Sequence, residues 1–159
     1  MISQRRCDKL LSKVRKNFPI LRTVKINLEI KPLKTGSMYA SKRFGYYVLT
    51  IDPLKYADAN DKEVIGALAH ELMHFETYEK FGWLRYLAEE FAFLFSKKLM
   101  SKYERQNDIN TIKRGYGKEI FANRVYRLSK ISKQEYKKIG SCYLMPKEIK
   151  QYMKKNNLR

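Results

Sequence analysis

The chain has 159 residues, 44% of them hydrophobic and 13% aromatic, with only 7 Gly and 4 Pro, so it is not disordered, collagen-like or of low complexity. Its length suits one compact domain, and its formal net charge of +18 comes from 34 Lys and Arg against 16 Asp and Glu. Two cysteines, Cys7 and Cys142, exclude a disulfide-rich scaffold, and the basic N-terminus and the lack of a long apolar run predict a cytoplasmic protein without a transmembrane segment.

The first third of the chain predicts one helix followed by three strands. Residues 3–16 carry apolar side chains three and four positions apart, which is typical of an amphipathic helix. Residues 23–30 alternate between apolar and polar, which indicates a half-buried strand. Residues 36–41 and 46–51 are two further strand-forming stretches, and the short polar segment between them predicts a hairpin.

The rest of the chain predicts helices. Asp61 is placed to cap a helix whose apolar residues recur three and four positions apart and which ends near Gly82. A second helical stretch begins near residue 83 and extends, with a break, towards residue 113. Further helical patterns cover residues 118–128 and, as two short lysine-rich pieces, the last thirty residues.

The stretch between residues 81 and 99 is rich in large apolar side chains. A domain of this size needs such a helix in its core, so we expect most of these side chains to be buried. A membrane-surface or partner-binding face is the alternative. The residues are Phe81, Trp83, Leu84, Leu87, Phe91, Phe93, Leu94, Phe95 and Leu99.

An HExxH motif, His70-Glu71-Leu72-Met73-His74, lies inside the clearest helical pattern. Residues four apart share one face of a helix, so both imidazoles can bind one metal ion, and Glu71 can reach a water on that ion. The spacing suits zinc, and these are the only two histidines of the chain. The alternative is a helix whose histidines fall four apart by chance, with Glu71 a solvated surface residue.

A third ligand is expected because a catalytic zinc ion has three protein ligands and an open position for water. The metzincin extension is absent, since its places hold Thr77 and Lys80, and a carboxylate is the remaining choice. We favour Glu104, because Asp108 follows one helical turn later and could accept the ring N–H of a zinc-bound histidine. The alternative for this pair is an exposed charged helix face. Weaker candidates, which no carboxylate follows four residues later, are Glu89, Glu90 and Glu119.

These two motifs resemble a known family. HELMH followed by ERQND is similar to the HExxH and ExxxD pair of gluzincin metallopeptidases, most of all the small soluble minigluzincins and the catalytic core of CAAX prenyl protease-like peptidases. The resemblance covers roughly residues 45–128. It implies an α+β, zincin-like fold in which a small antiparallel sheet of about three strands packs on the active-site helix. The edge strand, between Gly36 and Ile51, would bind an extended peptide.

The expected activity is that of a zinc metalloendopeptidase acting on a peptide or an unfolded protein. Zn2+ would be held by His70, His74 and Glu104, and Glu71 would act as general base and then general acid. A further hydrogen-bond donor is needed opposite the metal, and the sequence leaves the choice open. The candidates are Tyr116, Asn123, Arg124 and Arg127.

Two segments are expected: a catalytic domain over residues 1–130 and a basic helical segment over residues 131–159, packed on the same domain. Minigluzincins resemble zymogens in that their C-terminal segment can occupy the active-site cleft. The resemblance therefore implies that residues 131–159 are a latency segment. Two ordinary terminal helices are the alternative.

The net charge is unevenly distributed. Residues 1–51 hold 12 basic and 2 acidic side chains, residues 52–108 hold 8 and 11, and residues 109–159 hold 14 and 3. A solvated, lysine-rich surface is the simplest interpretation of the basic flanks, and binding to nucleic acid or to acidic or unfolded protein are others. The alternative function is therefore a nucleic-acid-associated SprT-like metalloprotease, or a basic binding module with a structural metal site.

Overall fold

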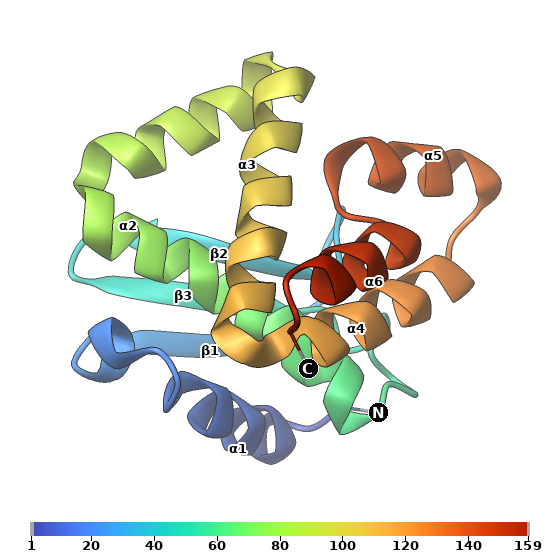
Figure 1. Ribbon diagram of the computed structural model, residues 1–159. Coiled ribbons are helices and arrows are strands. Elements are labelled where there is room, and N and C mark those ends of the chain that lie inside the picture. Colours follow the sequence, from blue (N-terminus) through green and yellow to red (C-terminus); the bar gives the residue numbers. More distant parts are fainter. Residues whose placement is uncertain (1, 159) are drawn as a thin grey trace.

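The N-terminal helix forms where the hydrophobic periodicity predicts it. The computed structural model describes residues 2–158 (Figure 1). Helix α1 (Gln4–Arg15) begins after Ser3, whose hydroxyl accepts a hydrogen bond from the Arg6 N–H. A short 3-10 helix, η1 (Pro19–Arg22), then leads towards the sheet. The buried face of α1 consists of Cys7, Leu10, Leu11 and Val14.

The sheet has three strands in the order β1–β3–β2. β2 (Met38–Arg43) and β3 (Tyr46–Ile51) form the expected antiparallel hairpin, whereas β1 (Ile26–Ile30) runs parallel to β3. The expectation of an antiparallel sheet is therefore wrong for β1, and the sheet is mixed. Ile30, at the end of β1, and Met38, at the start of β2, both pair with Ile51 at the C-terminal end of β3. Residues 31–37 therefore cross from one side of β3 to the other at this end. The hairpin then reverses the chain, so that β3 runs in the same direction as β1.

Helix α2 (Asp61–Phe95) begins at a capping box. The Asn60 side chain accepts a hydrogen bond from the Glu63 N–H (3.1 Å), and the Glu63 carboxylate accepts one from the Asn60 N–H (2.8 Å). These bonds satisfy two donors that the start of a helix leaves free. Asp61, the predicted cap, lies in the first turn instead and pairs with Arg6 at 2.7 Å.

Gly82 interrupts α2 at the place where the sequence predicts that one helical stretch ends and the next begins. Its φ of +75° turns the chain away from the core, and the helix continues to Phe95 before α3 (Lys97–Thr111) leads back (Figure 1). We call residues 81–99 the helical arm.

The prediction that the apolar side chains of the helical arm lie in the core is wrong. Periodicity shows that a helix has an apolar face but not what covers that face, and the bend at Gly82 carries this one into solvent. The side chain of Phe93 lies outside the described residues. The other eight are exposed: Phe81, Trp83, Leu84, Leu87, Phe91, Leu94, Phe95 and Leu99.

The remaining helices lie near the positions that the sequence predicts. α4 (Gly117–Ser129) packs against α2 at Gly66, where a Cβ atom would lie only 2.1 Å from the carbonyl oxygen of Glu119. This close approach requires a glycine and fixes where α4 crosses α2. The elements are a π-helical turn, η2 (Ile112–Tyr116), followed by α4 (Gly117–Ser129), α5 (Lys133–Cys142) and α6 (Pro146–Lys155).

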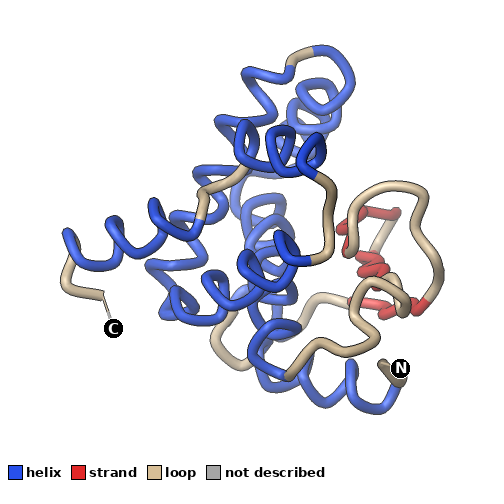
Figure 2. The backbone as a smooth tube through the Cα atoms, turned by 90° about the vertical axis from the view of Figure 1, so that its right-hand side faces the viewer, coloured by secondary structure: helices blue, strands red, loops and turns tan. Residues whose placement is uncertain are grey.

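The main core lies between the sheet, α1 and the first half of α2, and the sheet occupies one side of the molecule (Figure 2). Its fully buried members include Leu49 and Ile51 of β3 and Leu68, Leu72 and Phe75 of α2. In the part of the chain that the structure describes, no helix is both long enough and apolar enough to cross a membrane.

A second, smaller cluster fixes the C-terminal segment. Leu144 and Ile149, which come from residues 131–159, pack there against Ile112 and Ile120. α6 contacts α4, and α5 contacts α3. The segment is thus packed on the helices that also carry the candidate site.

Candidate metal centre

Helix α2 places His70 and His74 one turn apart. Their ring centroids are 5.1 Å apart, and the two residues are only 7% and 8% exposed. Leu68 and Leu72, on the same helix, are fully buried in the main core and hold this part of α2 in place. The positions of both rings therefore follow from the 3.6-residue repeat of a rigid helix.

Glu104, from α3, completes the group. Its Oε2 atom lies 3.1 Å from Nε2 of His70 and 3.5 Å from Nε2 of His74. One ligand atom from each of the three residues lies within 4.8 Å of the others. A tetrahedral ion with ligand bonds of about 2.0–2.1 Å separates its ligand atoms by about 3.3 Å, and the two distances from Glu104 lie on either side of that value. Two imidazole nitrogens and one carboxylate thus form a donor set that fits a divalent metal ion.

Asp108 orients His70. Its Oδ1 lies 2.9 Å from Nδ1 of His70. A proton on Nδ1 leaves the lone pair on Nε2, the atom that faces Glu104. Asp108 is fully buried and accepts further hydrogen bonds from Arg124 (2.8 and 3.0 Å) and from the Leu144 N–H (2.9 Å). Burial alone would raise the pKa of Asp108, but Arg124 and His70 outweigh it and hold this pKa below its usual range.

Glu89 makes the equivalent contact to His74 and was not predicted to do so. Its Oε2 lies 3.3 Å from Nδ1 of His74, and Arg85 donates to its other oxygen at 3.0 Å. Each histidine therefore has a carboxylate on Nδ1, which leaves both Nε2 atoms directed at Glu104. The one sequence signal for this role is that Glu89 and Glu90 interrupt an otherwise apolar stretch.

When no metal is bound, the carboxylates favour the protonated form of each imidazole, and the imidazoles favour the ionised form of Glu104. Burial would lower the pKa of His70, but hydrogen bonds to Asp108 and Glu104 outweigh it and raise this pKa to about 9. The pKa of His74 is also raised, because Glu104 and Glu89 outweigh the effect of burial. The same contacts hold the pKa of Glu104 far below its usual range, although burial opposes them. A metal ion would therefore displace protons from the imidazoles when it binds.

Glu71 lies beside the group without belonging to it. Burial raises the pKa of Glu71, an effect that His70 and His74 partly offset. Together with His70, it lines a small cavity of about 50 Å3 whose other walls include Tyr143 and Arg127. A carboxylate whose pKa is moved towards neutrality, next to a cavity and to a group that could hold a metal ion, is suited to general acid–base chemistry.

The four candidates for the hydrogen-bond donor opposite the metal differ in their contacts. The Tyr116 hydroxyl donates to the carbonyl of Val14 (3.1 Å), and Asn123 donates to the carbonyl of Glu63 (2.9 Å). Asn123, Arg124 and Arg127 all line the cavity, but the amide nitrogen of Asn123 already donates to Glu63 and to the Tyr56 hydroxyl (3.2 Å), so the two arginines are the better candidates.

Arg124 is the more deeply buried of the two. One of its terminal nitrogens bonds to Asp108, whereas Nε and the other terminal nitrogen are buried without a hydrogen-bond partner among the described residues. Its guanidinium lies 4.5 Å from the ring centroid of Tyr143, and that of Arg127 lies 5.7 Å from it. Two guanidinium groups therefore line the cavity together with Glu71, and two nitrogens of Arg124 can donate hydrogen bonds to a carbonyl oxygen.

No protein-family model, curated protein or solved structure matches this chain. Its function has to be inferred from its own residues.

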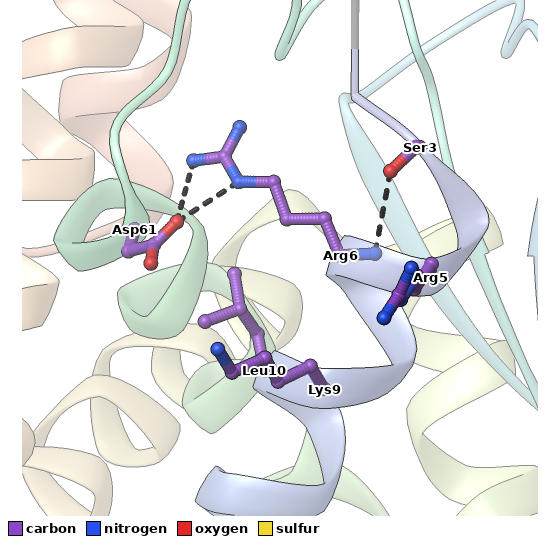
Figure 3. A pocket seen from close by; sticks show the side chains of 6 residues that line it. All are labelled: Ser3, Arg5, Arg6, Lys9, Leu10 and Asp61. Atoms are coloured by element: carbon purple, nitrogen blue, oxygen red, sulfur yellow. Dashed lines mark hydrogen bonds and ion pairs between the residues drawn. The ribbon is translucent and has the colours of Figure 1, made fainter.

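A larger hollow of about 470 Å3 lies between α1 and the start of α2, away from the metal centre (Figure 3). Within it Arg6 donates hydrogen bonds to the Asp61 carboxylate (2.9 Å) and to the carbonyl of Ala59 (2.8 Å). These contacts join α1 to the start of α2. We assign this hollow a structural role. It is lined by Ser3, Arg5, Arg6, Lys9, Leu10 and Asp61.

Proposed function

We propose that the chain is a zinc-dependent metalloendopeptidase of the gluzincin type with a zincin-like fold. The observation that carries this proposal is the convergence of His70, His74 and Glu104 on one point, with each imidazole oriented through Nδ1 by a carboxylate. Two histidines and a glutamate are the donor set of a catalytic zinc site that keeps one position open. The HExxH motif places Glu71 next to that position.

Zn2+ bound here would supply a Lewis acid and would lower the pKa of a water molecule towards neutrality. Glu71 would hold the proton that water gives up as its oxygen adds to the peptide carbonyl carbon, and would deliver this proton to the amine nitrogen as the C–N bond breaks. Arg127 and Arg124, across the cavity, donate hydrogen bonds to the substrate oxygen on which negative charge develops. Asp108 and Glu89 keep the imidazoles in the orientation that this chemistry needs.

The proposed substrate is an extended peptide segment. β2 is an edge strand in the order β1–β3–β2 and contacts α2. At its start, Ser37 and Met38 line the same cavity as His70 and Glu71. A peptide that adds to the outer edge of β2 would therefore be led across the metal centre.

The C-terminal segment is proposed to keep the site latent. The Tyr143 ring lies 5.8 Å from the His70 ring and forms one wall of the cavity. The segment is held by Arg105, which donates to the Tyr143 carbonyl (2.9 Å) and pairs with Glu148. Replacing Tyr143 with Ala should widen the cavity and raise the cleavage rate, whereas a loss of cleavage with zinc retained would indicate a catalytic role for its hydroxyl.

The proposal is tested by zinc analysis of the purified protein together with cleavage of unfolded casein, with and without a chelator. The parent and the Tyr143→Ala variant are both assayed, so that latency does not hide the activity. Glu71→Gln should retain zinc and lose at least about 100-fold in cleavage rate. Glu90→Gln, which removes a nearby carboxylate outside the metal group, is the matched control and should keep both. A protein that cannot be loaded with zinc, or a Glu71→Gln variant that cleaves normally, would refute the proposal.

A further inference from the structure

The exposed side chains of the helical arm form one continuous stripe. Leu84, Leu87, Phe91 and Leu94 follow one another at intervals of three, four and three residues, so they share one face of the helix. They are 80%, 44%, 60% and 70% exposed. Large apolar side chains that are exposed singly need no explanation, but a contiguous group marks an interaction surface.

The opposite face of the arm is attached to the protein. Ala92 is fully buried, and Arg85 and Glu89 lie one turn apart and form an ion pair (2.9 Å). Glu89 contacts His74, and the guanidinium of Arg85 lies 4.1 Å from the ring centroid of Tyr103. These contacts fix the rotation of the helix, so the apolar stripe faces outward.

Exposed lysines lie at both ends of the stripe. Lys80 precedes the arm, and Lys97, Lys98 and Lys102 follow Leu94, the last residue of the stripe. Trp83 lies at one end of the stripe and is 52% exposed. An apolar helix face with lysines and an aromatic ring at its ends is the pattern of a helix that lies in the interface of a lipid bilayer.

The net charge of the chain favours a lipid bilayer over a second copy of this chain as the partner that covers the stripe. Two copies would each bring a net charge of +18 to a shared apolar interface, and this repulsion opposes association. An anionic bilayer attracts the same lysines and also accepts the stripe.

We propose that the helical arm, residues 81–99, is a membrane-docking element that lies in the interface of an anionic lipid bilayer with Leu84, Leu87, Phe91 and Leu94 inserted. The inference does not depend on metal binding or on peptidase activity. The docked helix lies in the plane of the membrane surface and does not cross it.

Trp83 is the only tryptophan, so its fluorescence reports on the arm alone. The full-length protein is titrated with phosphatidylcholine vesicles with and without phosphatidylglycerol, and bound protein is also measured by co-sedimentation. With phosphatidylglycerol we expect a blue shift of the Trp83 emission, and quenching by lipids brominated on their acyl chains. Higher salt should weaken the binding.

The Leu84→Ser/Phe91→Ser variant should lose at least about tenfold in vesicle affinity, because two inserted side chains are removed. The matched control is Phe44→Ser/Leu54→Ser, which removes two large exposed apolar side chains from outside the arm and should bind as the parent does. Both variants should keep the circular dichroism spectrum and the thermal midpoint of the parent.

Three results would overturn the proposal. The first is an unchanged Trp83 emission with all vesicles. The second is equal loss of binding in the arm variant and in the control. The third is a parent that dimerises in sedimentation experiments while the Leu84→Ser/Phe91→Ser variant is monomeric, since this would assign the stripe to a second copy.

Discussion

Glu89 gives the sharpest test of how the metal centre is built. In the Glu89→Ala variant, His74 loses the carboxylate that lies 3.3 Å from its Nδ1 atom. The Glu89 side chain is only 11% exposed. The ring is then free to rotate, and Nε2 is no longer held towards Glu104. Loss of such an outer partner costs roughly 10–100-fold in metal affinity, which corresponds to about 1.4–2.7 kcal/mol. Glu104→Ala should cost far more, because it removes a ligand.

The assay is a competition titration of Zn2+ against a chromophoric chelator at neutral pH. Glu90→Ala is the matched control, since it removes a carboxylate from the adjacent position of the same helix, and it should change the affinity by less than about threefold. Equal losses in Glu89→Ala and Glu90→Ala would show that only net charge matters and would refute an orienting role for Glu89. No loss in Glu89→Ala would show that α2 alone holds His74.

Three further predictions concern stability. Asn60→Ala removes the capping box of α2 and should lower the free energy of unfolding by about 1 kcal/mol, measured by urea denaturation. Gly66→Ala places a methyl group 2.1 Å from the Glu119 carbonyl oxygen and should destabilise the protein by roughly 1–3 kcal/mol or more, because α4 has to move. In the metal-free protein the pKa of His70 is raised to about 9, so its stabilising contacts are fully present below the unfolded-state pKa of about 6.5 and are lost as the pH rises through 9. The urea midpoint should therefore fall between pH 6.5 and 9, and Glu104→Gln should reduce this dependence.

Each of these predictions has a contradicting result. Asp61→Ala is the control for the cap. A larger loss of unfolding free energy in Asp61→Ala than in Asn60→Ala would show that Asp61, the cap that the sequence predicts, stabilises the start of α2 more than Asn60 does. An unchanged urea midpoint in Gly66→Ala would mean that the crossing of α2 and α4 is looser than the structure has it. A midpoint that does not vary with pH in the metal-free protein would show that His70 is neutral beside Glu104.

The parts of the fold and site that the sequence predicts are those that depend on local repeats. The 3.6-residue period places His70 and His74 on one face wherever the helix lies, and the interval of four does the same for Glu104 and Asp108. Alternation and a short polar turn are likewise enough to indicate the hairpin. The structure brings these four site residues together as the spacing implies.

The parts that the sequence missed depend on how distant segments meet. The contact of Glu89 with His74 depends on the direction that the helix takes after the bend at Gly82, and no local sequence pattern contains that direction. The parallel pairing of β1 depends on the path of residues 31–37, which place β2 on the other side of β3 from β1. The exposed arm was missed for a related reason, since an apolar helix face has the same sequence pattern whether protein, lipid or water covers it.

The contact between Glu89 and His74 makes the helical arm and the metal centre parts of one thermodynamic cycle. Whatever fixes the arm would also fix Glu89, and a metal ion held by His74 would in turn restrain the arm. Reciprocity then requires that the factor by which a ligand of the arm changes metal affinity equals the factor by which the metal changes affinity for that ligand. The contact of Glu89 with His74 thereby connects an outward-facing surface to the centre of the molecule.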